Sequence, residues 1–165
     1  MGNMMGNIVY IGIDPGYREA GLGVINSSGE YIESTRFKNW TPSDLIKTLK
    51  LIQEEFTIAM VAVEEVHTFP GQGVVSSGHF MYATGIIIGI ISALHIPFVR
   101  VQPKAWRSAF NIGGKKKDER KKAALNFIRD KFPDIDFNLE IYHNVAEALL
   151  IAEYIRLKMK ESNNG

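Results

Sequence analysis

The chain contains no cysteine among its 165 residues. This absence excludes a disulfide framework, a thiolate zinc site and a cysteine nucleophile. The N-terminal sequence MGNMMGN also lacks the basic segment and the apolar run of a secretory signal. Both features fit a reducing compartment, and we expect a cytoplasmic protein.

Apolar runs long enough to span a bilayer are also missing. The longest run, Tyr82 to Leu94, contains several small residues and is shorter than the about 20 apolar residues that a membrane span requires. We expect a buried helix there and no membrane partner. A composition of 45% hydrophobic and 22% charged residues indicates one globular domain over residues 1–165, with flexible tails at 1–7 and 161–165.

The net charge is only +1 and says little about partners. Basic residues nevertheless concentrate between Arg100 and Lys131, where only Asp118, Glu119 and Asp130 oppose them. A localised basic stripe is typical of proteins that bind a phosphate backbone. A solvated helix face would produce the same pattern, and charge alone leaves both interpretations open.

The pattern of apolar residues predicts an α/β fold with a mixed five-stranded sheet flanked by helices. The first three strands follow one another through short turns, which indicates an antiparallel meander. The last two strands are joined by a helix and should be parallel. The expected strands are 8–14, 21–26, 31–37, 58–66 and 96–101. The first expected helix begins at Pro42 and has an apolar face as far as Ile52, and the others are 80–94, 103–110, 118–131 and 144–160.

Asp14 ends the apolar strand IVYIGID and precedes Pro15 and Gly16. An aspartate opens Pro-Gly turns routinely, because its side chain can accept hydrogen bonds from the following backbone. Ligands of such sheets, however, bind near the carboxyl ends of the strands. Asp14 and Glu64 both lie near such ends, so a functional interpretation also stands.

Glu64 and Glu65 follow the apolar segment MVAV. Strand alternation directs them to opposite faces, and at least one should point toward a covered surface of the sheet. A buried carboxylate must be protonated, paired or bound to a metal. The alternative is that both acids lie in the loop that follows Val66.

Glu147 lies within HNVAEALLIAEY, a segment that is apolar on every helical face apart from a few residues. A helix of this kind is buried, so Glu147 should be buried too. His143 and Asn144 precede it by four and three residues and can share its face. Either could simply cap the helix, as asparagine often does. The spacing favours a site role for His143 and leaves Asn144 open.

Three acids in apolar surroundings suggest one shared pocket. Clustered carboxylates repel each other unless a cation lies between them. Hard oxygen ligands favour Mg²⁺ or Mn²⁺, and two such ions can hydrolyse a phosphodiester. The basic stripe would then hold the nucleic-acid backbone.

Several blocks together resemble the RuvC type of Holliday junction resolvase. They are IGIDPG, VAVEEV, FPGQG followed by SSG, VQPKAWR and HNVAEALLIA. They are most similar to the phage-borne branch of the family and span Ile8 to about Tyr154. The resemblance implies an RNase H-like fold, a homodimer, and Mg²⁺- or Mn²⁺-dependent symmetric cutting of four-way junctions in DNA recombination and repair, in a bacterium or in the host cell of a virus.

The resemblance also implies roles for individual residues. Asp14, Glu64 and Glu147 match three of the four catalytic, metal-binding positions of the family. The fourth is often an acid, and His143 or Asn144 takes its place here. Phe69 is a candidate to stack on a base, or else anchors its loop. The DNA-binding candidates besides Phe69 are Gln72, Lys104, Arg107, Lys115, Lys116, Lys117 and Lys121.

Other functions remain open from the sequence. The chain could cut another branched DNA or RNA, or could bind junctions without cutting them, which the change at His143 and Asn144 allows. An actin-like ATPase shares the strand-Asp-Gly opening, but a second phosphate loop is missing. Gly85 and Gly89 could let two subunits approach in a dimer, although burial within one subunit explains them equally well.

Overall fold

A five-stranded mixed sheet forms the centre of the computed structural model, which describes residues 7–65, 67, 70–135 and 142–165. The strand order is β3-β2-β1-β4-β5. β1, β2 and β3 are antiparallel neighbours, and β4 and β5 are parallel to each other, as the sequence predicts. β4 also pairs parallel with β1, which joins the two parts of the sheet. The strands are β1 (Ile8–Asp14), β2 (Glu19–Asn26), β3 (Tyr31–Lys38), β4 (Thr57–Glu64) and β5 (Phe98–Val101).

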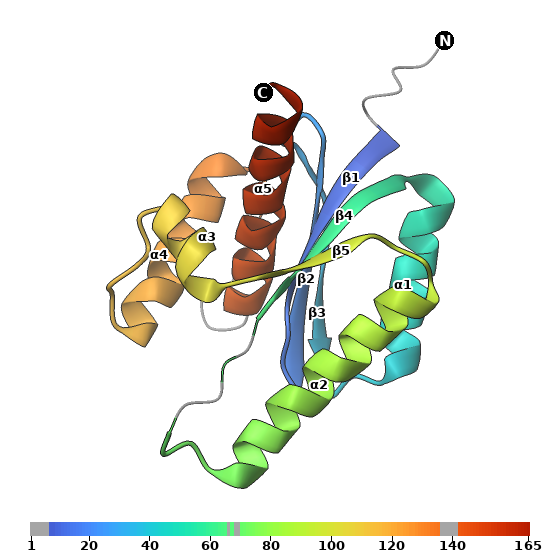
Figure 1. Cartoon of the computed structure of the whole chain (residues 1–165). Coiled ribbons are helices and arrows are strands. Elements are labelled where there is room, and N and C mark those ends of the chain that lie inside the picture. The colour runs from blue at the N-terminus through green and yellow to red at the C-terminus, as the bar shows by residue number, and fades with distance from the viewer. Residues whose placement is uncertain (1–6, 66, 68–69, 136–141) are drawn as a thin grey trace.

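Helices cover both faces of the sheet (Figure 1). α1 (Pro42–Glu55) and α2 (Val74–Ala93) lie on one face. α3 (Pro103–Ala109), α4 (Lys117–Lys131) and α5 (His143–Asn163) lie on the other. α5 contacts both β1 and β2 along its length and is the central helix of its layer.

Two helices extend beyond their predicted bounds. α2 begins at Val74, about six residues before the predicted start, and α5 continues to Asn163. The sequence predicted a loop over 67–78, because this segment is rich in Gly, Pro and Ser. The part that is helical, from Val74 onward, contains no proline, and its valine, serine and glycine residues each cost at most about 1 kcal/mol in a helix. Extending an existing helix is easier than starting a new one, so the first turns of α2 still form.

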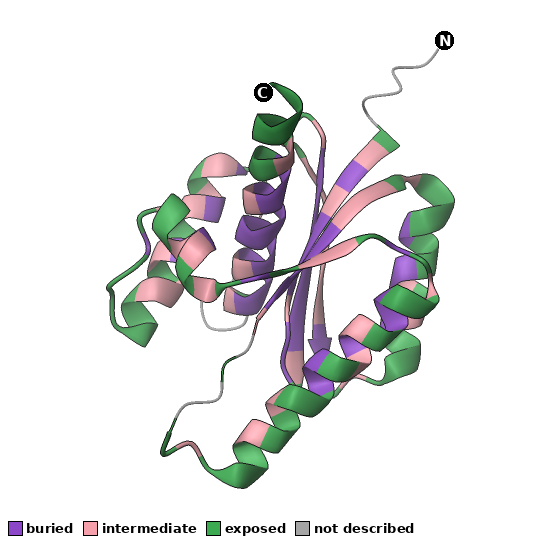
Figure 2. Cartoon of the chain, viewed as in Figure 1, coloured by how far each residue is buried: buried purple, intermediate pink, exposed green. Residues whose placement is uncertain are grey.

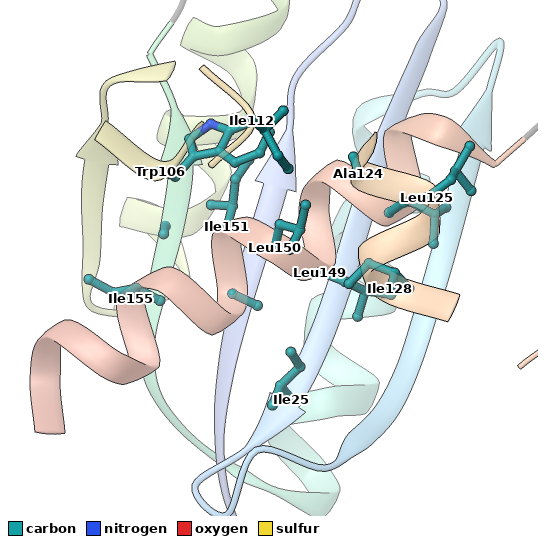
Figure 3. Packing of buried hydrophobic residues seen from close by; sticks show 14 of the residues in the cluster. Ile25, Trp106, Ile112, Ala124, Leu125, Ile128, Leu149, Leu150, Ile151 and Ile155 are labelled. Atoms are coloured by element: carbon teal, nitrogen blue, oxygen red, sulfur yellow. The ribbon is translucent and has the colours of Figure 1, made fainter. Parts of the chain in front are cut away.

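Strand alternation divides the side chains into two cores. Ile11 and Ile13 of β1 point toward α1 and α2. Ala62 of β4 lies on the opposite face, against the core that α3, α4 and α5 close. Figure 3 shows that second core, in which Trp106, Leu149 and Ile128 pack together and are fully buried.

Glycines in β1 and β2 allow α5 to lie unusually close to the sheet. A Cβ atom at Gly12 would be 1.9 Å from the carbonyl oxygen of Ala148. A Cβ at Gly21 would be 2.2 Å from the carbonyl oxygen of Asn144. No larger residue fits at either place without moving backbone. The first turns of α5, which carry Asn144 and Glu147, are therefore held directly against the ends of β1 and β2.

α2 is only partly covered by the rest of the chain, so the prediction of a buried helix at Tyr82 to Leu94 holds for one side of the helix and is wrong for the other. Figure 2 shows exposed residues along much of this helix, and its first half lies beyond the edge of the sheet. Val74 and Met81 are 88% and 66% exposed. Among the described residues, α2 is also the one helix with the length and hydropathy of a membrane span. Its inner face packs on the sheet through Ile87 and Ile91, as a helix of a folded core would.

We expect Gly12→Ala to destabilise the fold. The added methyl group would overlap the backbone of α5, and overpacking of a core costs typically about 1–3 kcal/mol, with backbone clashes at the upper end. Urea unfolding followed by circular dichroism measures the change. Gly89→Ala is the matched control, because a Cβ there meets no atom within 4 Å and alanine favours a helix. Equal stability of the two variants would contradict the close-packing explanation.

Candidate nuclease site

Three acidic side chains come together where α5 meets the ends of β1 and β4. Asp14 is the last residue of β1, Glu64 is the last residue of β4, and Glu147 lies in the second turn of α5. Glu64 shares the sheet face of Ala62, toward α5. The carboxylate of Asp14 interacts electrostatically with those of both Glu147 and Glu64. The predicted cluster of Asp14, Glu64 and Glu147 therefore forms in the structure.

Burial makes ionisation of this cluster unfavourable. It raises the pKa of Asp14 well above its ordinary value, and the negative charges of Glu147 and Glu64 raise it further. Burial likewise raises the pKa of Glu64 to about 7 and raises that of Glu147, although Arg107 opposes both shifts. The Asp14 and Glu147 carboxyl groups hydrogen-bond each other, which requires one of them to carry a proton.

Two neighbouring residues of α3 bind Glu64. The Trp106 indole N–H donates a hydrogen bond to Glu64 Oε2 at 2.6 Å, and Arg107 Nη2 lies 3.6 Å from the same oxygen. Trp106 is fully buried, and its link to Glu64 was not predicted from the sequence. Only the pairing of β4 with β5, which leads into α3, brings these residues together. The other oxygen of Glu64 has no hydrogen bond within the described residues.

Glu65 belongs to a different set of contacts. Its carboxylate accepts a hydrogen bond from the Gln102 side chain, and Arg100 Nη2 lies 3.8 Å away. Gln102 also contacts the ring of His67 at 2.5 Å. The structure thus answers a question that alternation leaves open: Glu64 faces Asp14 and Glu147, while Glu65 is tied to the start of α3.

Two cavities open onto the acids. One, of about 460 Å³, is lined by Asp14, Glu64 and Glu65 together with Lys104, Arg107 and Arg120. The other, of about 300 Å³, is lined by Asp14, Glu147, His143 and Asn144 together with Arg107 and three further cations of α4. Asp14, Pro15, Phe80, Arg107 and Arg120 line both cavities, so the two form adjoining parts of one site.

Searches of protein-family models and of curated proteins found no match to this chain. Several solved structures share its fold. Thermus thermophilus RuvC in complex with a Holliday junction substrate aligns with a TM-score of 0.70 at 18% identity, covering 93% of this chain and 96% of that one.

Two more distant relatives in fold are also resolvases. The Fowlpox virus resolvase in a Holliday junction complex aligns with a TM-score of 0.53 at 13% identity, over 92% of this chain and 99% of that one. The yeast mitochondrial Holliday junction resolvase Ydc2 aligns with a TM-score of 0.52 at 12% identity, over 97% of this chain and 82% of that one.

This chain has the RNase H-like fold of RuvC. The fold predicted from the sequence is therefore confirmed. At identities of 12–18%, these structural alignments show a shared fold only. The roles of individual side chains must be argued from the geometry of this site.

The two residues predicted as candidates for a fourth position of the cluster, His143 and Asn144, have different surroundings. Asn144 is buried, its amide interacts with Glu19, and its Oδ1 has no hydrogen-bond partner within the described residues. His143 is half-buried, and burial together with nearby Lys121 lowers its pKa, so the ring is neutral at pH 7. Both residues line the second cavity, and either could supply a metal ligand. Only the neutral ring of His143 could also accept a proton.

The predicted DNA-binding residues divide into two groups. Lys104, Arg107, Lys117 and Lys121 line the cavities, as does Arg120, which was counted in the basic stripe but not singled out. Its position one helical turn after Lys117 and Lys116 could have indicated it. Gln72, Lys115 and Lys116 line neither cavity. Phe69 lies outside the described residues.

The donors present fit a hard divalent cation. Three carboxylates and the unpartnered oxygen of Asn144 face the cavities, and oxygen ligands suit Mg²⁺ or Mn²⁺. The mutual repulsion of the acids is the kind that a bound cation relieves. Across the described ranges, no three Asp, Glu or His side chains already surround a single point as ligands would. Binding would therefore require side-chain adjustment.

We expect the metal-free protein to lose stability as the pH rises from 4.5 to about 7. The pKa of Glu64 is higher in the folded state than its ordinary value of 4.5, so the folded state binds more protons in that window. The full shift corresponds to about 3 kcal/mol. Thermal unfolding in EDTA at several pH values measures the slope.

Glu64→Gln should reduce that slope, because the amide does not titrate. Asp14 and Glu147, whose pKa is also raised, add to the slope in both proteins, and His143, whose pKa is lowered, opposes it. Glu19 and Glu153, whose pKa is lowered, titrate below about pH 4.5 and do not affect this window. A slope in Glu64→Gln as steep as in the wild type would show that Glu64 is ionised in the folded protein.

Proposed function

We propose that the chain is a metal-dependent endonuclease that resolves four-way DNA junctions. The convergence of Asp14, Glu64 and Glu147, beside two cavities lined by cations, carries this proposal. Buried carboxylates suit divalent cations, and the cations on the rim suit a phosphate backbone. The likeness in fold to RuvC and the Fowlpox virus resolvase, both solved with Holliday junction DNA, supports a branched substrate.

Asp14, Glu64 and Glu147 would hold Mg²⁺ or Mn²⁺, with His143 or Asn144 as a further ligand. When bound, two such ions activate a water and stabilise the leaving oxygen of a phosphodiester. Trp106 would fix the orientation of Glu64, since it holds one of the two carboxylate oxygens. The free oxygen then remains available for a cation.

The cationic side chains would hold the DNA strand. Arg107 reaches both cavities and can donate to a phosphate oxygen there. Lys117, Arg120 and Lys121 would bind neighbouring phosphates from α4. The neutral ring of His143 can accept a proton from the attacking water. Attack on phosphorus with loss of the 3′ oxygen leaves a 5′-phosphate and a 3′-hydroxyl.

A cleavage assay with a synthetic four-way junction tests this function. Purified protein is incubated with the junction, with linear duplex and with branched RNA, in Mg²⁺, Mn²⁺ or EDTA. We expect symmetric nicks in the junction only when a divalent ion is present. Asp14→Asn should cut at least 100-fold more slowly, because a lost metal ligand removes several kcal/mol of transition-state stabilisation.

Glu161→Gln serves as the control, since Glu161 is an exposed acid at the far end of the same helix as Glu147. It should cut at the wild-type rate. Equal cutting of duplex or RNA would favour a nuclease of another specificity. Metal-independent binding without cutting, unchanged in Asp14→Asn, would favour a junction-binding module.

We also propose that the protein acts as a homodimer through α2. Val74, Gly78, Met81, Gly85, Ile88 and Ser92 recur every three or four residues and so lie along one stripe of the helix. Cβ atoms at Gly78 and Gly85 would meet nothing within 4 Å, so packing inside this chain does not require these glycines. A second helix could approach closely there. A two-fold dimer would also match the near-symmetry of a junction.

The cytoplasmic location expected from the sequence stays a prediction.

Gly85→Glu should convert the dimer to a monomer, because it places a charge in the centre of the stripe. The monomer itself should fold normally, since the side chain enters open space. Sedimentation velocity measures the oligomeric state. Leu51→Glu adds the same charge at an exposed apolar residue of α1 and should leave the dimer intact. A dimer that survives Gly85→Glu would place the interface elsewhere.

A further inference from the structure

An exposed stack of aromatic rings lies next to the acidic site. Tyr17, in the turn between β1 and β2, stacks on His79 of α2 with ring centres 4.1 Å apart and planes only 4° from parallel. Tyr82, one turn later in α2, approaches the Tyr17 ring edge-on at 6.0 Å. Tyr17 and Tyr82 remain 44% and 60% exposed. These three residues are called the aromatic platform below.

The turn that carries Tyr17 is held firmly in place. The Trp40 indole N–H donates to the Gly16 carbonyl oxygen at 2.9 Å, and the Asn39 N–H donates to the Arg18 carbonyl oxygen. A Cβ at Gly16 would be 2.0 Å from the Glu19 carbonyl oxygen, so the turn is tightly closed. Hydrogen bonds thus hold the residues directly before and after Tyr17, and the stack on His79 holds its ring. Little conformational entropy would be lost when a planar ligand binds to it.

The platform adjoins the cavities that hold the acids. Pro15 lines both cavities, as does Phe80, directly after His79. Gly16, directly before Tyr17, lines the second. The cations Arg107, Arg120 and Lys121 lie around the same cavities. A strand whose phosphate lies beside Asp14 would therefore have its neighbouring nucleotides within reach of the Tyr17 ring.

We propose that the aromatic platform binds an unpaired or unstacked base of the DNA substrate, next to the phosphate that is cut. The proposal rests on the nuclease function proposed above. Aromatic rings stack on any base, and cations nearby hold the backbone, which together are the features of single-strand recognition. Bases in linear duplex are stacked on both sides, whereas the strand-exchange point of a junction can present one. The platform would thereby favour branched over linear DNA.

The platform is distinct from the stripe proposed for dimer formation. His79 and Tyr82 lie three residues apart on the flank of α2 that faces Tyr17. Val74, Gly78, Met81 and Gly85 lie on the adjoining face of the helix. A second subunit can thus pack on the stripe while the platform stays open to DNA.

Tyr17→Ala and Tyr17→Phe test the proposal. The probes are a four-way junction and a linear duplex, each in EDTA so that no cutting occurs, with 2-aminopurine at successive positions around the strand-exchange point. Tyr17→Ala should bind the junction roughly 5- to 150-fold more weakly, the range expected for one base–aromatic stack. Tyr17→Phe keeps the ring and should bind within about twofold of the wild type, and duplex binding should change little in either variant.

The fluorescence gives a second readout. A 2-aminopurine that stacks on the platform should be quenched by wild-type protein and by Tyr17→Phe, but not by Tyr17→Ala. Leu51→Ala, which removes an exposed apolar side chain from α1, should match the wild type in both measurements. Circular dichroism melts confirm that the variants fold.

Three outcomes would overturn the proposal. Unchanged junction binding by Tyr17→Ala would show that no base stacks there. An equal loss of affinity for the junction and for the duplex in Tyr17→Ala would show that Tyr17 contacts DNA in a way that does not depend on an accessible base. Loss of the dimer in Tyr17→Ala would assign the platform to a second copy of the chain. If wild-type protein itself shows no preference for the junction, the proposed function fails instead, and the two failures are thereby distinguished.

Discussion

The direct contact between the backbone of α5 and the backbones of β1 and β2 determines the arrangement of the whole site. Gly12 and Gly21 leave no side chain between the helix and the sheet, so the helix lies against the strands. Glu147 is consequently brought to Asp14 at the carboxyl end of β1. The same contact buries Asn144 beside the second cavity. A helix held farther away by larger side chains would separate these groups.

That packing buries three carboxylates close to one another, and the surrounding residues offset their mutual repulsion only in part. Three carboxylates are buried together, and burial favours their neutral forms. A proton shared between Asp14 and Glu147, the indole N–H of Trp106 and the guanidinium of Arg107 each offset part of the repulsion. Divalent cations would offset the remainder. Protons and the proposed metal ions would therefore compete for the same oxygens.

Much of the fold follows from local patterns. The short turns predicted the meander, the helix between the last two strands predicted their parallel pairing, and the apolar run around Glu147 predicted a buried helix. The start of α2 was missed because its Gly- and Ser-containing first turns indicated a loop, whereas continuation of an existing helix outweighs their weak propensity. The roles of Trp106 and Arg107 at Glu64 were also missed. They depend on the pairing of β4 with β5, a long-range contact with no local signal.

The sequence by itself determined which residues are anomalous: Asp14, Glu64 and Glu147 are acids in apolar segments, where an isolated charge is too costly to keep. It also determined the five strands and the buried character of α5, because these depend on neighbours in the chain. Only the tertiary structure decided that the three acids meet, that Glu64 and not Glu65 joins them, and that Tyr17 stacks on His79 beside them. These are contacts between segments far apart in the chain, and close packing, not periodicity, decides them.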